Sequence, residues 1–138
     1  MTTLFSLRGR ATRIGVTDGR LNGCPASPNC VCSDNGDTAH AIEPLRLASE
    51  SADVWPQVER AVREFPRTRV TSCSADYLHA ECASALFGFV DDLELHLRRD
   101  HGIIAVRSAA RLGYADFGVN RRRIERLRAI LRARGIVR

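Results

Sequence analysis

Hydrophobic and polar residues follow one another with two different periods along this chain, and the change of period marks the predicted elements. In residues 51–65 the apolar spacing is that of a helix with one buried stripe, made of Trp55, Val58, Val62 and Phe65. Ser51 or Asp53 can cap this helix, and Pro66 ends it. In residues 121–134 the same spacing predicts a second helix, with Asn120 as its N-cap, Gly135 as its stop and a buried stripe of Ile124, Leu127, Ile130 and Leu131.

Between these helices the apolar residues recur at alternate positions, which is typical of strands with one buried face. The segments "TRVTSCS" (68–74) and "YLHAECASALF" (77–87) flank a turn at Ala75 and Asp76. Leu78, Ala80, Cys82 and Leu86 share one face of the second segment. Two more strands, "FVDDLELHLR" (89–98) and "GIIAVRSAAR" (102–111), are joined through "RDHG". This order predicts an α+β fold, with an antiparallel sheet of about four strands and two helices packed on one face.

The first 50 residues show neither period and are rich in Gly, Pro, Asn, Asp and Ser, which are loop residues. We expect a single domain over residues 1–138, in which 1–50 form an extended, mostly irregular lead-in and 51–138 the body. No apolar run is long enough to span a bilayer, and "MTTLFSLRGRATRIG" is a poor signal peptide. We therefore expect a soluble cytoplasmic protein, with export as the alternative if a leader has been removed.

The parity of the third and fourth strands predicts which side chains share a face. A two-residue turn between them would place Leu93, Leu95 and Leu97 beside Ile104, Val106 and Ser108, which makes an apolar face for the helices. The opposite face collects charged residues, because a slip by one position would put Arg107 among the leucines. These residues are Asp92, Glu94 and His96 on one strand and Arg107 and Arg111 on the other. Ile103 and Ala105 share that face, and we expect the cysteine-rich N-terminal segment to cover it.

The charge of the chain is carried by an unusual set of residues. All 21 basic side chains are arginine, and with 16 acidic residues they give a net charge of +5. An arginine guanidinium presents a planar fork that matches a carboxylate or a phosphate. Aromatic residues make up only 6% of the chain and are not interleaved with the arginines, which disfavours a nucleic-acid partner.

Three of the five cysteines lie close together in "CPASPNCVC". Cys24, Cys30 and Cys32 with His40 could bind zinc, but their spacing is not that of a zinc site, where pairs lie two to four residues apart. A pair of Cys24 with Cys30 is the better interpretation, since Pro25 and Pro28 force a tight loop between them. This pair would be a disulfide in an oxidising compartment and reduced thiols in the cytosol. We expect no metal and no cofactor.

Three motifs, "CPASPNCVCS", "FVDDLELHL" and "IAVRSAARLGYADFGVNRRRIERLR", resemble the domain-of-unknown-function 1499 family of bacterial and plant proteins. The resemblance runs roughly from Gly15 to Leu131. The family pattern falls on Cys24, Pro25, Ser27, Pro28, Asn29, Cys30, Phe89, Asp91, Asp92, Glu94, Arg107, Ser108, Arg111, Gly113, Asp116, Gly118, Asn120 and Arg121. Cys32 departs from it, since serine is the more usual residue there. The resemblance implies the domain and its motifs but supplies no reaction.

The charged face and the loop "LGYADFG" suggest one candidate site. Arg107 and Arg111 lie on the same sheet face, and the loop can return Arg121 towards them at the start of the last helix. We expect these three arginines to bind a small anion, a carboxylate or a phosphate, with Asp92, Glu94, Asp116 and Asn120 orienting them. Whether such a site would also be catalytic is left open.

One alternative to this hypothesis and one further interpretation stay open. The first is a non-catalytic structural or protein-interaction module, in which the same arginines and carboxylates pair with one another and bind no ligand. The second concerns Arg122, Arg126, Arg128 and Arg132, which are interpreted as the solvated face of the last helix. A partner protein is compatible with the first alternative.

Overall fold

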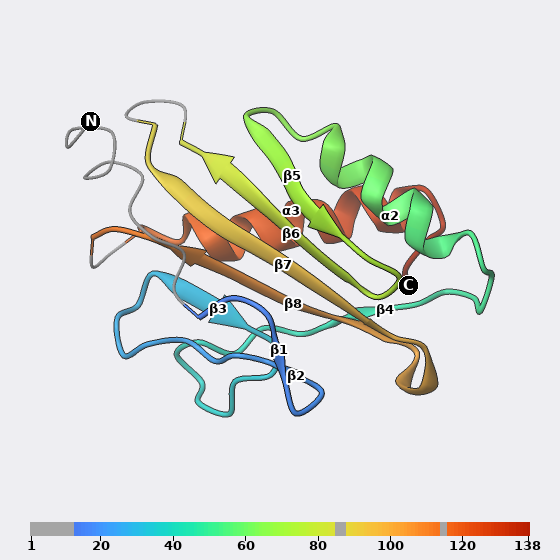
Figure 1. Cartoon of the computed structure of the whole chain (residues 1–138), viewed down its shortest axis with the longest axis horizontal. Helices are drawn as coiled ribbons and strands as arrows, with labels where there is room; N and C mark the ends of the chain where they lie inside the picture. The colour runs from blue at the N-terminus through green and yellow to red at the C-terminus, as the bar shows by residue number, and fades with distance from the viewer. Residues whose placement is uncertain (1–12, 85–87, 114–115) are drawn as a thin grey trace.

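The computed structural model describes residues 13–84, 88–113 and 116–138 (Figure 1). Its largest element is a six-stranded antiparallel sheet in the order β3-β8-β7-β6-β5, with β4 pairing with β8 as well. The strands are β3 Cys30–Cys32, β4 Leu45–Arg46, β5 Thr68–Cys73, β6 Tyr77–Ala83, β7 Val90–Arg98 and β8 Ile103–Ala110. The other elements are the hairpin β1 Val16–Thr17 and β2 Arg20–Leu21, the helices α2 Val54–Arg63 and α3 Val119–Ala133, and a 3-10 turn, η1 Arg99–His101.

The register of β7 and β8 is the one that strand parity predicts. Leu93 pairs with Ser108, Leu95 with Val106 and Leu97 with Ile104. The face made by these residues is buried under α2 and α3, and α3 runs behind the sheet in the view of Figure 1. The buried stripes of the two helices close the main core, with Trp55, Val58 and Val62 from α2 and Ile124, Leu127 and Leu131 from α3. The α+β class and the placement of both helices on one face are therefore confirmed.

The opposite face of the sheet is covered by the N-terminal segment. The Gly15 N–H donates to the Glu94 Oε1 atom at 2.7 Å, and Leu21 packs with Cys32 and Ala105 in a second, smaller apolar cluster. This contact explains why Ala105, on the charged face, is completely buried. The charged residues of that face lie in a covered layer and do not form a solvated ladder.

The sheet is larger than the predicted four strands. Residues 1–50 were expected to be mostly irregular, and the two added strands, β3 and β4, are short pieces of this segment that pair with β8. Cys30–Cys32 and Leu45–Arg46 are too short to show a period of their own. They become strands because β8 offers them an unpaired edge more than 50 residues further along the chain.

The ends of the helices differ from the expected ones. Helix α3 begins at Val119 with Gly118 as its N-cap, so Asn120 is not the cap and lies buried inside the first turn. The side chain of Asp116 supplies the capping acceptors, at 2.9 Å from the Gly118 N–H and 3.2 Å from the Asn120 N–H. Helix α2 is shorter than residues 51–65, and its N-cap, Asp53, makes no side-chain capping hydrogen bond. Gly135 ends α3 with a φ of 73°, as predicted.

The connection between β7 and β8 spans residues 99–102, so it is longer than the expected two-residue turn, and Gly102 in it has a φ of 65°. The longer connection keeps the predicted pairing because it changes the loop by an even number of residues. A bulge interrupts the pairing of β5 with β6 at Thr71. Leu86, predicted for the apolar face of β6, lies outside the described residues. Within the ranges that the structure describes, neither helix is long and apolar enough to cross a membrane.

Candidate functional site

Arg107 and Glu94 form a buried ion pair at the centre of the charged face. They lie directly opposite each other on β8 and β7, their side chains are 1% and 0% exposed, and Arg107 Nη1 lies 2.8 Å from Glu94 Oε2. The other carboxylate oxygen, Oε1, accepts the Tyr77 hydroxyl at 2.8 Å in addition to the Gly15 N–H. Burial and the adjacent Glu94 charge raise the pKa of Tyr77, so its hydroxyl stays protonated and donates. Glu94 is thus held by three donors, one of which is Arg107.

Arg111 is bound by two carboxylates at the side of this pair. Its Nη2 atom lies 2.7 Å from Asp92 Oδ1 and 2.8 Å from Glu81 Oε2, and its Nε atom donates to Asp92 Oδ2 at 2.9 Å. Burial on its own raises the pKa of Asp92, but the hydrogen bonds from Arg111 and His79 outweigh burial and place this pKa below its ordinary value. The guanidinium of Arg111 is therefore committed to protein carboxylates.

His79 extends this cluster towards the surface. Its Nε2 atom lies 2.6 Å from Asp92 Oδ1, and its Nδ1 atom is hydrogen-bonded to the hydroxyl of Thr71 in the bulge of β5. The Thr71 hydroxyl also donates to the backbone carbonyl of His79 at 3.1 Å, so the same contact anchors the bulge.

The structure does not bring all the predicted site residues together. Arg107, Arg111, Asp92 and Glu94 form the covered layer just described. Arg121, Asp116 and Asn120 belong to α3 and the loop before it, on the helical side of the sheet. The side chain of Arg121 is exposed and lines a separate depression with Pro28, Val31 and Phe117. Tyr114 and Ala115, part of the loop expected to return Arg121 towards Arg107, lie outside the described residues.

Asp116 and Asn120 instead belong to a buried polar cluster between α3 and the sheet. Asn120 Oδ1 accepts the Ser108 hydroxyl at 2.6 Å, and Asn120 Nδ2 donates to Asp116 Oδ2 at 2.7 Å and to the Asn29 carbonyl at 3.2 Å. Arg123 Nη1 donates to both Asn120 Oδ1, at 2.7 Å, and Ser108 Oγ, at 3.1 Å. The cluster therefore fixes the direction in which Arg123 leaves the helix.

A salt bridge completes the fixation of Arg123. Its Nη2 atom lies 2.8 Å from Asp91 Oδ2, and both side chains are largely buried. Burial raises the pKa of Asp91 although Arg123 opposes this shift. Three partners on two strands and one helix thus hold a single guanidinium in place before any ligand arrives.

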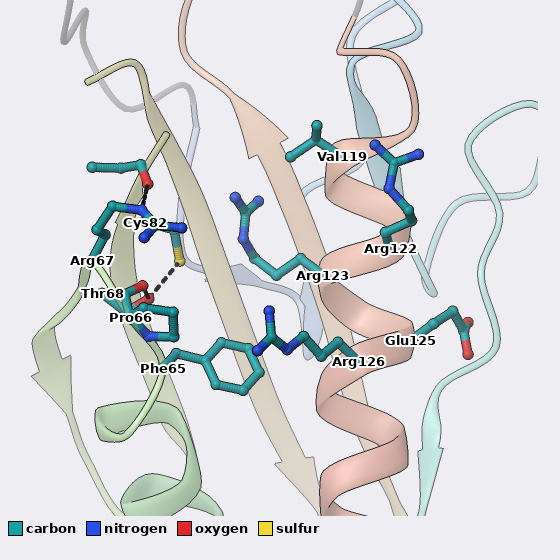
Figure 2. Close-up of a pocket in the computed structure, with 11 residues that line it drawn as sticks. Phe65, Pro66, Arg67, Thr68, Cys82, Val119, Arg122, Arg123, Glu125 and Arg126 are labelled. Carbon is teal, nitrogen blue, oxygen red and sulfur yellow. Dashed lines mark hydrogen bonds between the residues drawn. The ribbon is translucent and has the colours of Figure 1, made fainter. Parts of the chain in front are cut away.

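Arg123 points into a groove of about 500 Å³ between α3 and the ends of β5 and β6 (Figure 2). Two other guanidinium groups face the same space, Arg67 from the turn before β5 and Arg126 from the next turn of α3. Arg122 and Val119 lie at the end of the groove near the start of α3. The apolar part of the lining is Phe65, Pro66, Cys82, Ala83 and Val119. We call this space the arginine groove.

The arginines of the groove differ in how far the protein neutralises them. No carboxylate in the described part of the chain lies within ion-pair distance of Arg67, Arg122 or Arg126, and every Asp and Glu of the sequence is described. Arg67 donates to the Ala83 carbonyl, Arg122 to the Phe117 carbonyl, and Arg126 stacks over Phe65 at 6.0 Å. These contacts position the groups without cancelling their charge.

The remaining titratable lining residues add no compensating charge. Glu125 points away from the strands in Figure 2 and bonds to Arg128 at 2.9 Å. Burial raises the pKa of the Cys82 thiol, which keeps it neutral, and Thr68 donates its hydroxyl to this sulfur. The groove is therefore a positively charged hollow with an apolar floor.

The sequence pattern was interpreted as placing Arg122, Arg126, Arg128 and Arg132 on a solvated helix face. This is wrong for Arg128, which is buried and donates to the carbonyls of Glu43 and Pro44 at 2.7 Å. Arg67 and Arg123 were not among the predicted site residues. Arg123 and Arg126 are three residues apart, so the sequence does predict that their side chains share one side of α3. What the sequence lacks is the position of Arg67, whose approach depends on how the turn after α2 meets α3.

The cysteine pair lies far from the groove along the chain and belongs to the covering segment. Cys24 and Cys30 form a disulfide with their Cα atoms 5.7 Å apart, and Cys32 is a buried free thiol. His40, the fourth member of the zinc alternative, is bound to Asp37 Oδ2 at 2.6 Å and to the Ser27 carbonyl at 2.9 Å. Among the described residues, no group of three or more His, Cys, Asp and Glu side chains could hold a metal ion.

Comparison with known proteins agrees with the resemblance seen in the three motifs. A family model described as a protein of unknown function, DUF1499, matches residues 20–131. No curated protein and no solved structure matches the chain. The matched range includes β3, the whole sheet and most of α3, and thus every residue of the arginine groove.

Proposed function

The chain belongs to the DUF1499 family, and because that family's description assigns no activity, we propose a function from the geometry: the protein binds a small anionic ligand, a phosphate or carboxylate, in the arginine groove. The carrying observation is that Arg67 and Arg126 face one hollow on either side of Arg123 without a carboxylate partner. Guanidinium groups that line one hollow and have no carboxylate of the protein as a partner can bind an external anion there.

The preorganisation of Arg123 supports this proposal. Ser108, Asn120 and Asp91 hold its guanidinium, so little side-chain freedom is lost when a ligand binds. Arg126 is partly ordered by Phe65 in the same way. The apolar floor favours an anionic group attached to an organic body over a bare inorganic ion.

The original candidate, Arg107 with Arg111 and Arg121, is less well supported as a ligand site. Arg107 and Arg111 already have protein carboxylates as partners, and Arg121 is not in contact with either of them. The ion pairs of Arg107 and Arg111 favour the second candidate function for that face, a structural network that holds the covering segment on the sheet. A protein-interaction module without a small ligand would keep this network and leave the arginine groove empty.

The proposal is tested by titrating pyrophosphate and citrate into the protein in a calorimeter. Wild type should bind at least one of them, and the double variant Arg67→Gln/Arg126→Gln should lose about tenfold in affinity or more, since a hydrogen bond to a charged group is worth about 1.5–3 kcal/mol. Arg121→Gln is the matched control, an exposed arginine of the same helix outside the groove, and should bind like wild type. Equal loss in the control, or no binding by wild type, contradicts the proposal.

A further inference from the structure

Phe117 has a conformation and an exposure that folding does not explain. It is 88% exposed, the most exposed large apolar side chain among the described residues. Its φ is 54°, in the left-handed region that a bulky residue adopts at a cost in energy. A residue that buries almost nothing and strains its own backbone contributes little to the stability of the native state. Phe117 is therefore available for a contact outside the fold.

Phe117 is joined to the arginine groove through its backbone, while its side chain lines the neighbouring depression that contains Arg121. Arg122 Nη1 donates to its carbonyl oxygen at 2.8 Å, which ties the residue to the first turn of α3. Val119, which is 40% exposed, lines the end of the groove (Figure 2). Phe89, also 40% exposed, follows the groove residue Ala83 across the β6–β7 connection, where its carbonyl accepts the Ser84 N–H at 2.7 Å. Val119 thus lines the end of the groove where α3 begins, Phe117 precedes it by two residues, and Phe89 is joined by its backbone to Ser84, the residue after the groove residue Ala83.

We propose that the anion taken by the groove is the phosphate of an anionic membrane lipid, and that Phe117, Val119 and Phe89 enter the bilayer interface beside that headgroup. This inference rests on the proposed function, because it names the source of the anion. Arginines that bind lipid phosphates and aromatic side chains that lie among the headgroups are the two parts of a reversible membrane contact. Here the groove supplies the arginines, and the residues at the start of α3, Phe117 and Val119, supply the exposed apolar side chains beside it.

A membrane surface explains more of the observations than a soluble anion does. A soluble phosphate would need only Arg67, Arg123 and Arg126, and its binding would leave the exposure of Phe117 unexplained. The net charge of +5 attracts the whole molecule to an anionic surface, where each nearby arginine adds to the attraction. A protein partner could bury Phe117 as well, but it would not require Arg67 and Arg126 to be without carboxylate partners in the neighbouring groove.

The inference is tested by co-sedimentation of the full chain with vesicles of phosphatidylcholine alone and with vesicles in which about a third of the lipid is phosphatidylglycerol. Wild type should bind only the anionic vesicles, and added salt should release it. Phe117→Asn should lose about tenfold in vesicle affinity, since the apolar contribution of one aromatic side chain is gone. Asparagine tolerates a positive φ, so this variant should keep or exceed the thermal stability of wild type.

Pyrophosphate titration of the same two proteins separates this inference from the proposed function. Equal pyrophosphate binding by wild type and Phe117→Asn, with vesicle binding reduced in the variant, supports the inference. Pyrophosphate binding without vesicle binding overturns the inference and leaves the proposed function standing. Failure to bind either ligand overturns both. Vesicle binding that Phe117→Asn leaves unchanged, or association of the chain with itself that depends on Phe117, also overturns the inference.

Discussion

At the scale of single residues, the protein uses arginine in two distinct ways. Arg107 and Arg111 are buried and bound by carboxylates, whereas Arg67 and Arg126 are exposed and have no carboxylate partner. A buried guanidinium keeps its charge, so the protein must supply an anion for it, while an exposed one is free to bind an external anion. The same residue type therefore holds the fold on one face of the sheet and, in the function we propose, binds a ligand on the other.

We expect Arg107→Leu to destabilise the protein by about 3–5 kcal/mol, because it leaves the Glu94 charge buried without its cation. Urea unfolding measures this loss. The double variant Arg107→Leu/Glu94→Leu should recover much of it, since no charge then stays buried. A loss below about 1 kcal/mol in the single variant would show that Arg107 does not hold this face.

The Arg111 cluster predicts a dependence on pH. The hydrogen bond from Arg69 first, and then that from Arg111, lowers the pKa of Glu81, and the pKa of Asp92 is also below its ordinary value. Carboxyls with a depressed folded-state pKa stabilise the protein above their unfolded pKa, about 4, and lose this contribution as the pH falls through the folded pKa. The destabilisation caused by Arg111→Met, measured by thermal unfolding, should therefore be largest at neutral pH and shrink below about pH 4. A difference from wild type that does not vary with pH would argue against this cluster.

At the scale of elements, the spacing of apolar residues predicted those helices and strands whose position depends on their own sequence. The register of β7 and β8 follows from the leucines at alternate positions, and the stripes of α2 and α3 follow from helical spacing. The strands β3 and β4 escaped prediction because they exist only through pairing with β8, a partner distant in sequence. The start of α3 was misplaced because Asn120, a good N-cap by type, is recruited by Ser108 and Asp116 instead.

The candidate site divides in the same way. The alternation of residues along β7 and β8 was enough to place Arg107 opposite Glu94. Asn120, which is bonded to Asp116, does orient an arginine, but that arginine is Arg123 and not Arg121. The groove itself was not predictable, because it is formed by the packing of α3 against the turn that carries Arg67. Packing of this kind depends on side-chain shapes across the whole core and leaves no periodic signal in one segment.

The link between α3 and the sheet gives a prediction for Asn120. We expect Asn120→Ala to lower the free energy of unfolding by about 1–3 kcal/mol, because the buried Ser108 hydroxyl and Asn29 carbonyl lose a partner. Pyrophosphate affinity should fall with it, since Arg123 loses one of the acceptors that orient it. Chemical denaturation and calorimetry on the same samples measure both effects. A variant as stable as wild type would mean that this cluster does not join the helix to the sheet.

At the scale of the whole molecule, the sheet separates the covered ion pairs from the side that carries the proposed binding site. The N-terminal segment, closed by the disulfide of Cys24 with Cys30, covers the buried ion pairs, and the two helices cover the main core. The arginine groove opens where the helical layer meets the ends of β5 and β6 (Figures 1 and 2). A ligand bound there would touch α3, the turn before β5 and the end of β6, so its stabilisation of the native state should grow with the logarithm of ligand concentration above Kd.

The central claim is that an external anion binds to the arginines of the groove and not to those of the covered face. The most direct measurement is an NMR titration of the arginine Nε–Hε signals with pyrophosphate. The account predicts shifts that saturate together at Arg67, Arg123 and Arg126, while the signals of Arg107 and Arg111 stay in place. Saturating shifts at Arg107 and Arg111 with unchanged signals at Arg67 and Arg126 would contradict it.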